Sequence, residues 1–246
     1  MRITLFICTI LLNLVPVYSA IPAQARTFQE LEDQARTSNE MVKGKSFGDG
    51  LGFVESMLNV IKRNAGYVFD SRILGIKKSR LETGRATYFF KKPQKVRLEV
   101  HSHGMNNGAV VVKQSDGLIR ASGGGALKFV KMTLEPDSRM LQLPNGYNVI
   151  SSDLASLLTG LKRRAQNGAS ISVSNEAVSD KGQTLKIIEV QGRESSKDHK
   201  LERIFVDTKT RVPVRWEVYT NGGLVSITEF DNFKPRPDLS EDLFQL

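Results

Sequence analysis

Residues whose types suit catalysis or metal binding are few in this sequence and lie far apart. Glu99, His101 and His103 alternate along one predicted strand, so their side chains could share a face, as metal ligands can. His199 stands alone in a charged stretch, and the chain has three histidines in all. Because Gly104 is expected to end the strand, we interpret the histidine pair as a surface feature and predict no metal site.

Other catalytic patterns are weak or missing. Gly123-Gly124-Gly125 lacks the Lys-Ser/Thr pair and helix that would complete a phosphate loop, so it predicts a flexible turn. The carboxylates of Glu241 and Asp242 lie near the chain end and are expected to be solvated. Neither the spacing of a serine nucleophile elbow nor a zincin helix motif occurs. We therefore predict a protein that is not an enzyme and needs no cofactor. An enzyme would require Glu99, His101, His103 and nearby acids to converge in one cleft.

The first residues have the three parts of a secretory signal peptide. Arg2 supplies the positive charge, 3–15 is nearly all apolar, and Ala23-Gln24-Ala25 offers small residues for cleavage before Arg26. Cleavage as early as Ala20 stays open. The apolar run is shorter than the roughly 20 residues of a membrane-spanning helix, although an uncleaved anchor is the alternative. We expect export and removal of the leader.

About 220 residues remain after cleavage, enough for one sizeable core or at most two small domains. The single cysteine, Cys8, lies inside the leader and too deep in its apolar run for lipid attachment. The mature chain is therefore expected to be soluble, without a disulfide or a lipid anchor. The predicted division is a signal peptide over 1–25, a helical segment over 26–48, and one domain over 49–246.

Charge is unevenly spread along the chain, whose formal net charge is +9. Between Lys62 and Glu99 there are eleven basic residues against three acidic ones. Such a basic stretch can bind phosphates of nucleic acid or of lipid headgroups, and the alternative is a solvated face of a sheet. Because export separates the protein from nucleic acid, we expect no nucleic-acid partner.

Hydrophobic periodicity predicts three helices and about ten or eleven strands. Helices are expected over 27–41, over 49–63, and from Leu154 to Gly168, the last two with apolar stripes. Period-two alternation begins at Tyr67, and Asn221-Gly222-Gly223 predicts a hairpin turn. The expected strands are 67–71, 87–91, 96–101, 108–113, 117–121, 126–133, 169–174, 184–191, 200–206, 212–219 and 223–231. The fold class is mainly β with α (α+β), a strongly curved antiparallel sheet or unclosed β-barrel of about 11 strands with covering helices.

A strongly curved sheet must fill its concave side with side chains, helices or a ligand. Over 212–219, Val214, Trp216 and Val218 are expected to point one way, while Arg215 and Glu217 point the other. A plain packed core is the alternative to a cavity. The candidate residues for an apolar inner surface are Tyr67, Phe69, Tyr88, Phe90, Val96, Leu98, Val100, Val214, Trp216 and Val218.

Two segments resemble the LolA-like superfamily, that of the periplasmic outer-membrane lipoprotein carriers. In the first, the strand ending at Lys91 leads through the basic-Pro turn Lys92-Pro93 to a second strand and then to Asp116-Gly117. The second is an Asp-x-x-Thr-x-x-Pro strand pair over 206–219. The middle of the chain, 134–158, is closer to a little-characterised branch of the superfamily that carries a domain of unknown function.

The resemblance covers roughly residues 50 to 245. It implies an unclosed barrel whose helices form a lid over an apolar cavity, and it implies a monomeric periplasmic protein that holds lipid or lipoprotein acyl chains. Contact with an envelope protein or transiently with a membrane surface stays open. A protein-interaction module with a filled core and no lipid ligand is the alternative. The implied lid and gating residues are Lys92, Leu154, Leu157 and Leu158.

One position departs from the family pattern. The carriers have an arginine immediately before the turn proline, where it hydrogen-bonds to the lid, and this chain has Lys92. A lysine lacks the planar donor fork of arginine and cannot make the same set of bonds. The carrier's gating mechanism is therefore in question for this chain, and Lys92 as a solvated turn residue is the alternative.

Overall fold

The structure, a computed structural model, describes residues 20–77, 80–101, 107–143, 146–192 and 200–246. Its helices are α1 Ala20–Val42, α2 Leu51–Arg63, α3 Leu154–Gln166 and the short η1 Gly125–Leu127, η2 Arg139–Leu141, η3 Val149–Ser151 and η4 Asp242–Phe244. Its strands are β1 Phe47–Asp49, β2 Gly66–Lys77, β3 Arg80–Lys91, β4 Lys95–Val100, β5 Val110–Lys113, β6 Ile119–Ser122, β7 Lys131–Leu134, β8 Ser170–Ser174, β9 Val178–Asp180, β10 Gln183–Gln191, β11 Lys200–Asp207, β12 Pro213–Thr220 and β13 Gly223–Pro235.

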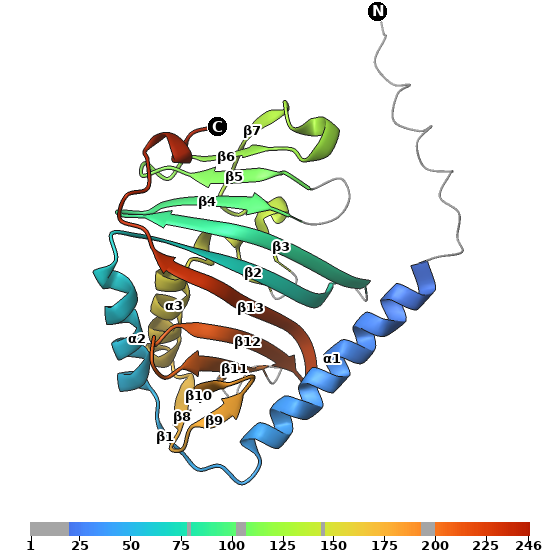
Figure 1. Cartoon of the computed structure of the whole chain (residues 1–246), viewed down its shortest axis with the longest axis vertical. Coiled ribbons are helices and arrows are strands. Elements are labelled where there is room, and N and C mark those ends of the chain that lie inside the picture. The colour runs from blue at the N-terminus through green and yellow to red at the C-terminus, as the bar shows by residue number, and fades with distance from the viewer. Residues whose placement is uncertain (1–19, 78–79, 102–106, 144–145, 193–199) are drawn as a thin grey trace, which may run out of the picture.

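The described strands form one 13-stranded sheet in the order β1-β8-β10-β11-β12-β13-β2-β3-β4-β5-β6-β7, with β9 added beside β10. Neighbouring strands are antiparallel throughout. Figure 1 shows this order running from β1 at the bottom to β7 at the top, so the sheet does not close on itself. The predicted α+β class with an unclosed antiparallel sheet is confirmed.

Local sequence explains two of the turns. Asn221 and Gly222 both have positive φ, 52° and 82°, and join paired residues Thr220 and Gly223, which confirms the predicted hairpin. The predicted continuous strand over 126–133 is wrong. There Gly125 adopts φ 53° and starts the helical turn η1, and Val130 N bonds the Leu127 carbonyl, so pairing begins only at Lys131.

Helices α2 and α3 cover one face of the sheet, which we call the inner face. The predicted stripes of both helices are buried in the main core with the inner side chains of the strands. Asp153 caps α3 by accepting a bond of 3.0 Å from the Ser156 N–H, and Gly168, at φ 92°, ends it. Just before this cap, Tyr147, Val149 and Ser152 face the inner side of the sheet.

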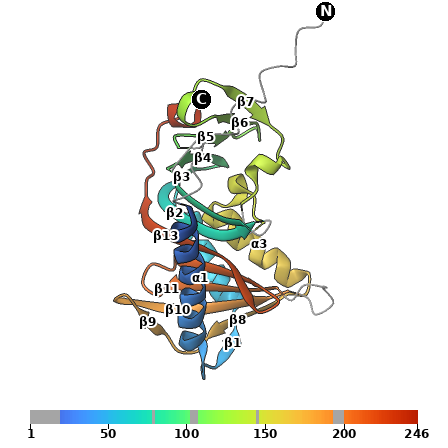
Figure 2. The same cartoon turned by 90° about the vertical axis from the view of Figure 1, so that its right-hand side faces the viewer.

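Helix α1 lies against the opposite, outer face (Figure 2). Ser38 Oγ donates to Glu217 Oε1 at 2.5 Å, and Arg203 Nη1 donates to Asn39 Oδ1 at 2.9 Å. On α3, by contrast, Arg164 bonds Glu202, the sequence neighbour of Arg203. Successive side chains of a strand point to opposite faces, so α1 and α3 lie on different sides of the sheet.

Helix α1 begins at Ala20, earlier than the predicted start near residue 27. Residues 1–19 of the predicted signal peptide lie outside the described residues, and the three-part division of the chain stays a prediction. Within the described ranges no helix combines the length and the apolar character that a membrane crossing needs.

The basic stretch between Lys62 and Glu99 is partly neutralised by acids brought from elsewhere in the chain. Glu241, near the C-terminus, pairs with Lys91 at 2.8 Å and also with Lys95. Other ion pairs of the stretch are Arg72 with Glu30 and Glu229, and Arg97 with Glu99. These contacts favour the interpretation of the stretch as a solvated sheet face with internal partners.

Candidate functional site

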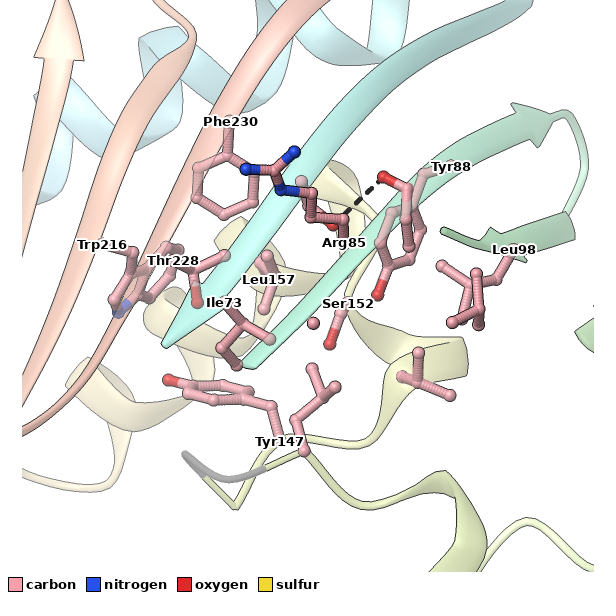
Figure 3. A pocket seen from close by; sticks show the side chains of 16 residues that line it. Ile73, Arg85, Tyr88, Leu98, Tyr147, Ser152, Leu157, Trp216, Thr228 and Phe230 are labelled. Carbon is pink, nitrogen blue, oxygen red and sulfur yellow. Dashed lines mark hydrogen bonds between the residues drawn. The ribbon is translucent and has the colours of Figure 1, made fainter. Parts of the chain in front are cut away.

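A cavity of about 140 Å³ lies between the inner face and residues of the segment 146–157, together with Leu143 (Figure 3). Its walls come from β2, β3, β4, β12 and β13 on the sheet side and from the chain around α3 on the other. The lining residues are Ser71, Ile73, Gly84, Arg85, Ala86, Tyr88, Leu98, Val100, Leu143, Tyr147, Val149, Ser152, Leu157, Trp216, Thr228 and Phe230. Most are apolar, so the cavity suits an apolar ligand.

The sheet register brings the lining side chains together. Tyr88 on β3 pairs with Leu98 on β4, and Trp216 on β12 pairs with Thr228 on β13. Directly paired residues of antiparallel strands project to the same face. Burial raises the pKa of Tyr88 and of Tyr147 above its usual value, so both hydroxyls stay protonated and bring no charge to the wall.

A buried carboxylate holds two of the aromatic walls. Glu202, 1% exposed, accepts bonds at Oε2 from the Tyr147 hydroxyl at 2.7 Å and from Trp216 Nε1 at 2.9 Å. Arg164 adds two donors, to Oε1 at 2.5 Å and to Oε2 at 3.0 Å, and Lys200 Nζ lies 3.0 Å from Oε1. Every donor on Glu202 comes from a different element, so this residue ties α3, Tyr147 before η3, and β12 to β11.

The charges around Glu202 keep it ionised. Burial alone would raise the pKa of its carboxyl, but the hydrogen bonds and charge of Arg164, with Lys200 and the Tyr147 hydroxyl, lower it to about 2. A buried carboxylate with this many donors is a fixed structural anion. It orients Tyr147 and Trp216 and is not exposed to a ligand in the cavity.

A larger cleft of about 640 Å³ adjoins the cavity. Tyr147 and Leu157 line both spaces and therefore stand between them. The apolar part of the cleft includes Phe90 and Val96, and its ionisable lining residues are Lys113, Asp153, Arg163, Arg164 and Lys200. A third space, of about 580 Å³, continues past Phe90 and Pro93 to Lys62 and Lys92.

The structure brings together many of the residues that the sequence singled out for the inner surface. Tyr88, Leu98, Val100 and Trp216 line the cavity. Phe90 and Val96 line the adjoining cleft. Tyr67, Phe69 and Val218 belong to the same core without lining either space.

Val214 is not placed with Trp216 and Val218, contrary to the simple alternation expected of 212–219. The pairing of β11 and β12 shifts between Phe205 and Val206, and Val214 packs instead with Phe205 and its neighbours in a separate cluster. A β-bulge adds one residue to a strand, which breaks the period of two at that point.

Of the implied lid residues, some line the cavity and others do not. Leu157, 7% exposed, lines the cavity and the cleft. Leu154 and Leu158, also on α3, are fully buried and line neither space. Lys92 is exposed, and its Nζ donates to the Lys62 carbonyl at the end of α2 at 2.6 Å. The lysine thus makes one bond to a helix carbonyl, and a gating role for it stays a prediction.

Glu99 and His101, from the predicted histidine strand, contact different residues. Glu99 accepts a bond of 2.7 Å from Arg97 Nε, and His101 Nε2 lies 3.0 Å from Thr87 Oγ1. His103 and His199 lie outside the described residues. In the part of the chain that the structure describes, no group of three or more His, Cys, Asp or Glu could hold a metal ion.

Sequence reasoning missed Glu202, Arg164 and Tyr147. Glu202 had a usable signal, because it alternates with Ile204 and Val206 and is thus a carboxylate on the apolar side of a strand. Such a position requires a buried partner. Its partners could not be found from the sequence, since Tyr147 lies 55 positions away in the chain.

Neither a protein-family model nor a curated protein matches the chain. Among solved structures, a DUF1329 family protein from Desulfovibrio piger matches at 10% identity and a TM-score of 0.46, over 80% of this chain and 95% of that one. A LolA superfamily protein from Nitrosomonas europaea matches at 11% identity and a TM-score of 0.37, over 78% and 97%. The Pseudomonas aeruginosa MucA/MucB complex matches at 14% identity and a TM-score of 0.48, over 81% of this chain and 61% of that one.

Proposed function

We propose that this protein is an exported carrier that shelters an acyl chain on the inner face of its sheet. The observation that carries the proposal is the cavity of about 140 Å³ with a mostly apolar lining. Each methylene moved from water into such a space contributes about 0.8 kcal/mol. The periplasm is the compartment in which an exported chain with these features would act.

The size of the cavity sets a condition on the proposal. An engineered cavity of about 150 Å³ admits one benzene-sized group, so the present cavity of about 140 Å³ accepts only part of an acyl chain. More room must come from movement of residues 146–157 or from the adjoining cleft. Leu157, which borders both spaces, is the lid candidate that such a movement displaces first.

The lining also bears on the class of function. The described side chains around the cavity include no carboxylate, imidazole or thiol that could act as a general base or nucleophile. The hydroxyl groups in this lining belong to Ser71, Ser152 and Thr228 and to two protonated tyrosines. This lining supports binding over catalysis.

Trp216 gives a direct test, because it is the only tryptophan of the chain and lines the cavity. A brominated fatty acid quenches a tryptophan at contact distance. We expect saturable quenching of Trp216 by the brominated acid and none by the unbrominated one. Absence of saturable quenching, with no lipid found by native mass spectrometry of gently purified protein, would refute the proposal.

A matched control places the single tryptophan outside the cavity. In the double variant Trp216→Phe/Phe129→Trp the single tryptophan stands at a position that is 81% exposed and lines none of the three spaces. Binding in the cavity leaves this tryptophan unquenched. Equal quenching of both proteins would mean that the acid binds nonspecifically.

A protein-interaction module is the second candidate, and an exposed apolar cluster favours it. Leu127, Phe129 and Val130 are 50%, 81% and 48% exposed and precede β7, an edge strand of the sheet. A partner could add a strand to β7 and bury Phe129 as an anchor. Pull-down from envelope extracts with wild type and with Phe129→Ser tests this. Capture of one protein at fixed stoichiometry, lost in the variant and without lipid, would favour this second function.

A further inference from the structure

We infer that the ligand is an anionic amphiphile whose charged head binds in the cleft while its chain passes Tyr147 and Leu157 into the cavity. The inference rests on the proposed function and deepens it. It names the chemistry of the head, which the apolar cavity by itself leaves open.

The two spaces are separated by two side chains. Tyr147 and Leu157 line both the cavity and the cleft, so displacing either side chain would join the spaces. Leu157 is held by α3, whereas Tyr147 lies on the chain between η2 and η3 and is half-buried. Tyr147 is therefore the more easily moved half of this partition.

The contacts of the Tyr147 side chain include charged groups and the ring of Trp216. Its hydroxyl donates to Glu202 Oε2 at 2.7 Å and accepts from Arg164 Nη2 at 3.1 Å. Lys200 Nζ lies 5.3 Å from the centre of its ring. An anion arriving in the cleft competes for these same cations, so head binding and movement of the ring are coupled.

The cleft has more positive than negative charge. Lys113, Arg163, Arg164 and Lys200 line it together with Asp153, and Glu202 lies behind Arg164 and Lys200. Four cations thus face two carboxylates. Among the described acids, none lies within ion-pair distance of Lys113 or Arg163. The excess is available to a negative head group.

The apolar surface beside these cations selects for a chain as well. Phe90, Val96 and Leu157 lie in the same cleft and lead toward the cavity. Inorganic phosphate would pair with the cations but leave this apolar surface exposed to water. A chain with a neutral head would bury the apolar surface but leave the cations without an anionic partner. An anionic amphiphile satisfies both.

The test compares three probes by equilibrium dialysis and Trp216 fluorescence, below the micelle concentrations. They are dodecyl phosphate, dodecylphosphocholine and inorganic phosphate. Dodecyl phosphate is expected to bind wild type about tenfold more tightly than dodecylphosphocholine does, and inorganic phosphate much more weakly than either. In Lys113→Gln/Arg163→Gln the affinity for dodecyl phosphate falls about tenfold, while that for dodecylphosphocholine is unchanged.

A charge-matched control separates local from general electrostatics. Lys43→Gln/Lys209→Gln removes the same net charge at exposed positions that line none of the three spaces. It is expected to leave both affinities unchanged. An equal loss in both double variants would overturn a specific head site.

The remaining outcomes distinguish failure of the head site from failure of the carrier proposal. If both dodecyl probes bind equally and the cleft variant changes neither, the head site is refuted and the cavity proposal stands. If inorganic phosphate binds as tightly as dodecyl phosphate, the chain plays no part and the coupled site is refuted. If no dodecyl probe binds, the carrier proposal itself fails.

Tyr147→Phe tests the partition. The variant keeps the ring and removes the hydroxyl bonds to Glu202 and Arg164, so the observed association rate of dodecyl phosphate is expected to rise about tenfold. Stopped-flow fluorescence of Trp216 measures the rate. An unchanged rate would mean that the chain does not enter past Tyr147.

Discussion

Tyr147 and Trp216 meet edge to face, with ring centroids 5.9 Å apart and an interplanar angle of 69°, and both donate to the same carboxylate oxygen. That oxygen is Oε2 of Glu202, which is 1% exposed. Two rings that shape the cavity are thus oriented by one buried anion. The geometry of the apolar site consequently depends on a carboxylate that does not itself line the cavity.

Replacement of Glu202 should be strongly destabilising. Glu202→Gln removes the charge that balances Arg164 and Lys200 and weakens the bonds that this buried carboxylate accepts, which costs about 1–3 kcal/mol of unfolding free energy. Urea unfolding followed by circular dichroism measures it. The control Glu176→Gln, which removes an exposed partner of Lys45, should change the same quantity by about 1 kcal/mol or less. Equal effects of the two would contradict the structural role of Glu202.

The stability should also depend on pH through Glu202. Its pKa in the folded protein is about 2, below the 4.5 of a free glutamate, so the folded state binds fewer protons than the unfolded chain. Its contribution, roughly 3 kcal/mol, is present above about pH 5 and is lost as the pH falls toward 2. Unfolding free energies measured from pH 7 downward should fall more steeply for wild type than for Glu202→Gln. Parallel curves would show that the pKa is not lowered.

Glu217 should have the opposite pH dependence. Burial raises its pKa above 4.5, against the pull of Arg215 and the bonds from Ser38 and Tyr219. The folded state therefore binds more protons here, and stability declines as the pH rises from 4.5 through the folded pKa. Relative to wild type, Glu217→Gln should become more stable as the pH rises above 4.5. A relative loss over that range would contradict the raised pKa.

Leu157→Ala should separate stability from binding. The change removes a wall between cavity and cleft, so it is expected to lower the unfolding free energy by about 2–5 kcal/mol and to raise the affinity for long acyl chains. Leu158→Ala is the matched control, since Leu158 is fully buried and lines neither space. It should lose similar stability without a gain in affinity. Titrations of Trp216 fluorescence with fatty acids of increasing length distinguish the two.

Period-two alternation predicted the sheet well because most of its strands have one face toward a continuous core. Trp216 and Val218 follow that rule, and the bulge beside Phe205 is where it fails for Val214. The short strand β9 lacks a repeat long enough to be recognised. Helix α3 was predictable from its leucine stripe and from Asp153, because caps and stripes are local signals.

The candidate site could be predicted only in its apolar part. Tyr88, Leu98 and Trp216 were available from alternation alone. The network around Glu202 required knowledge of which distant segments meet, since Arg164 and Tyr147 lie 38 and 55 positions away from it. Their contacts depend on how Tyr147 and α3 meet β11, and no local sequence pattern encodes that meeting.

The place of β13 between β12 and β2 has a consequence for the order of folding. Strands β2 to β7 form one run of sequential neighbours and β10 to β13 another, and the two runs are joined by the pairing of β13 with β2. That pairing joins residues 67–75 to 226–235, and closing so long a loop slows folding. A growing chain cannot complete this sheet until its last strand has been made. The cavity, which takes walls from both runs, therefore cannot form before β13 has been synthesised.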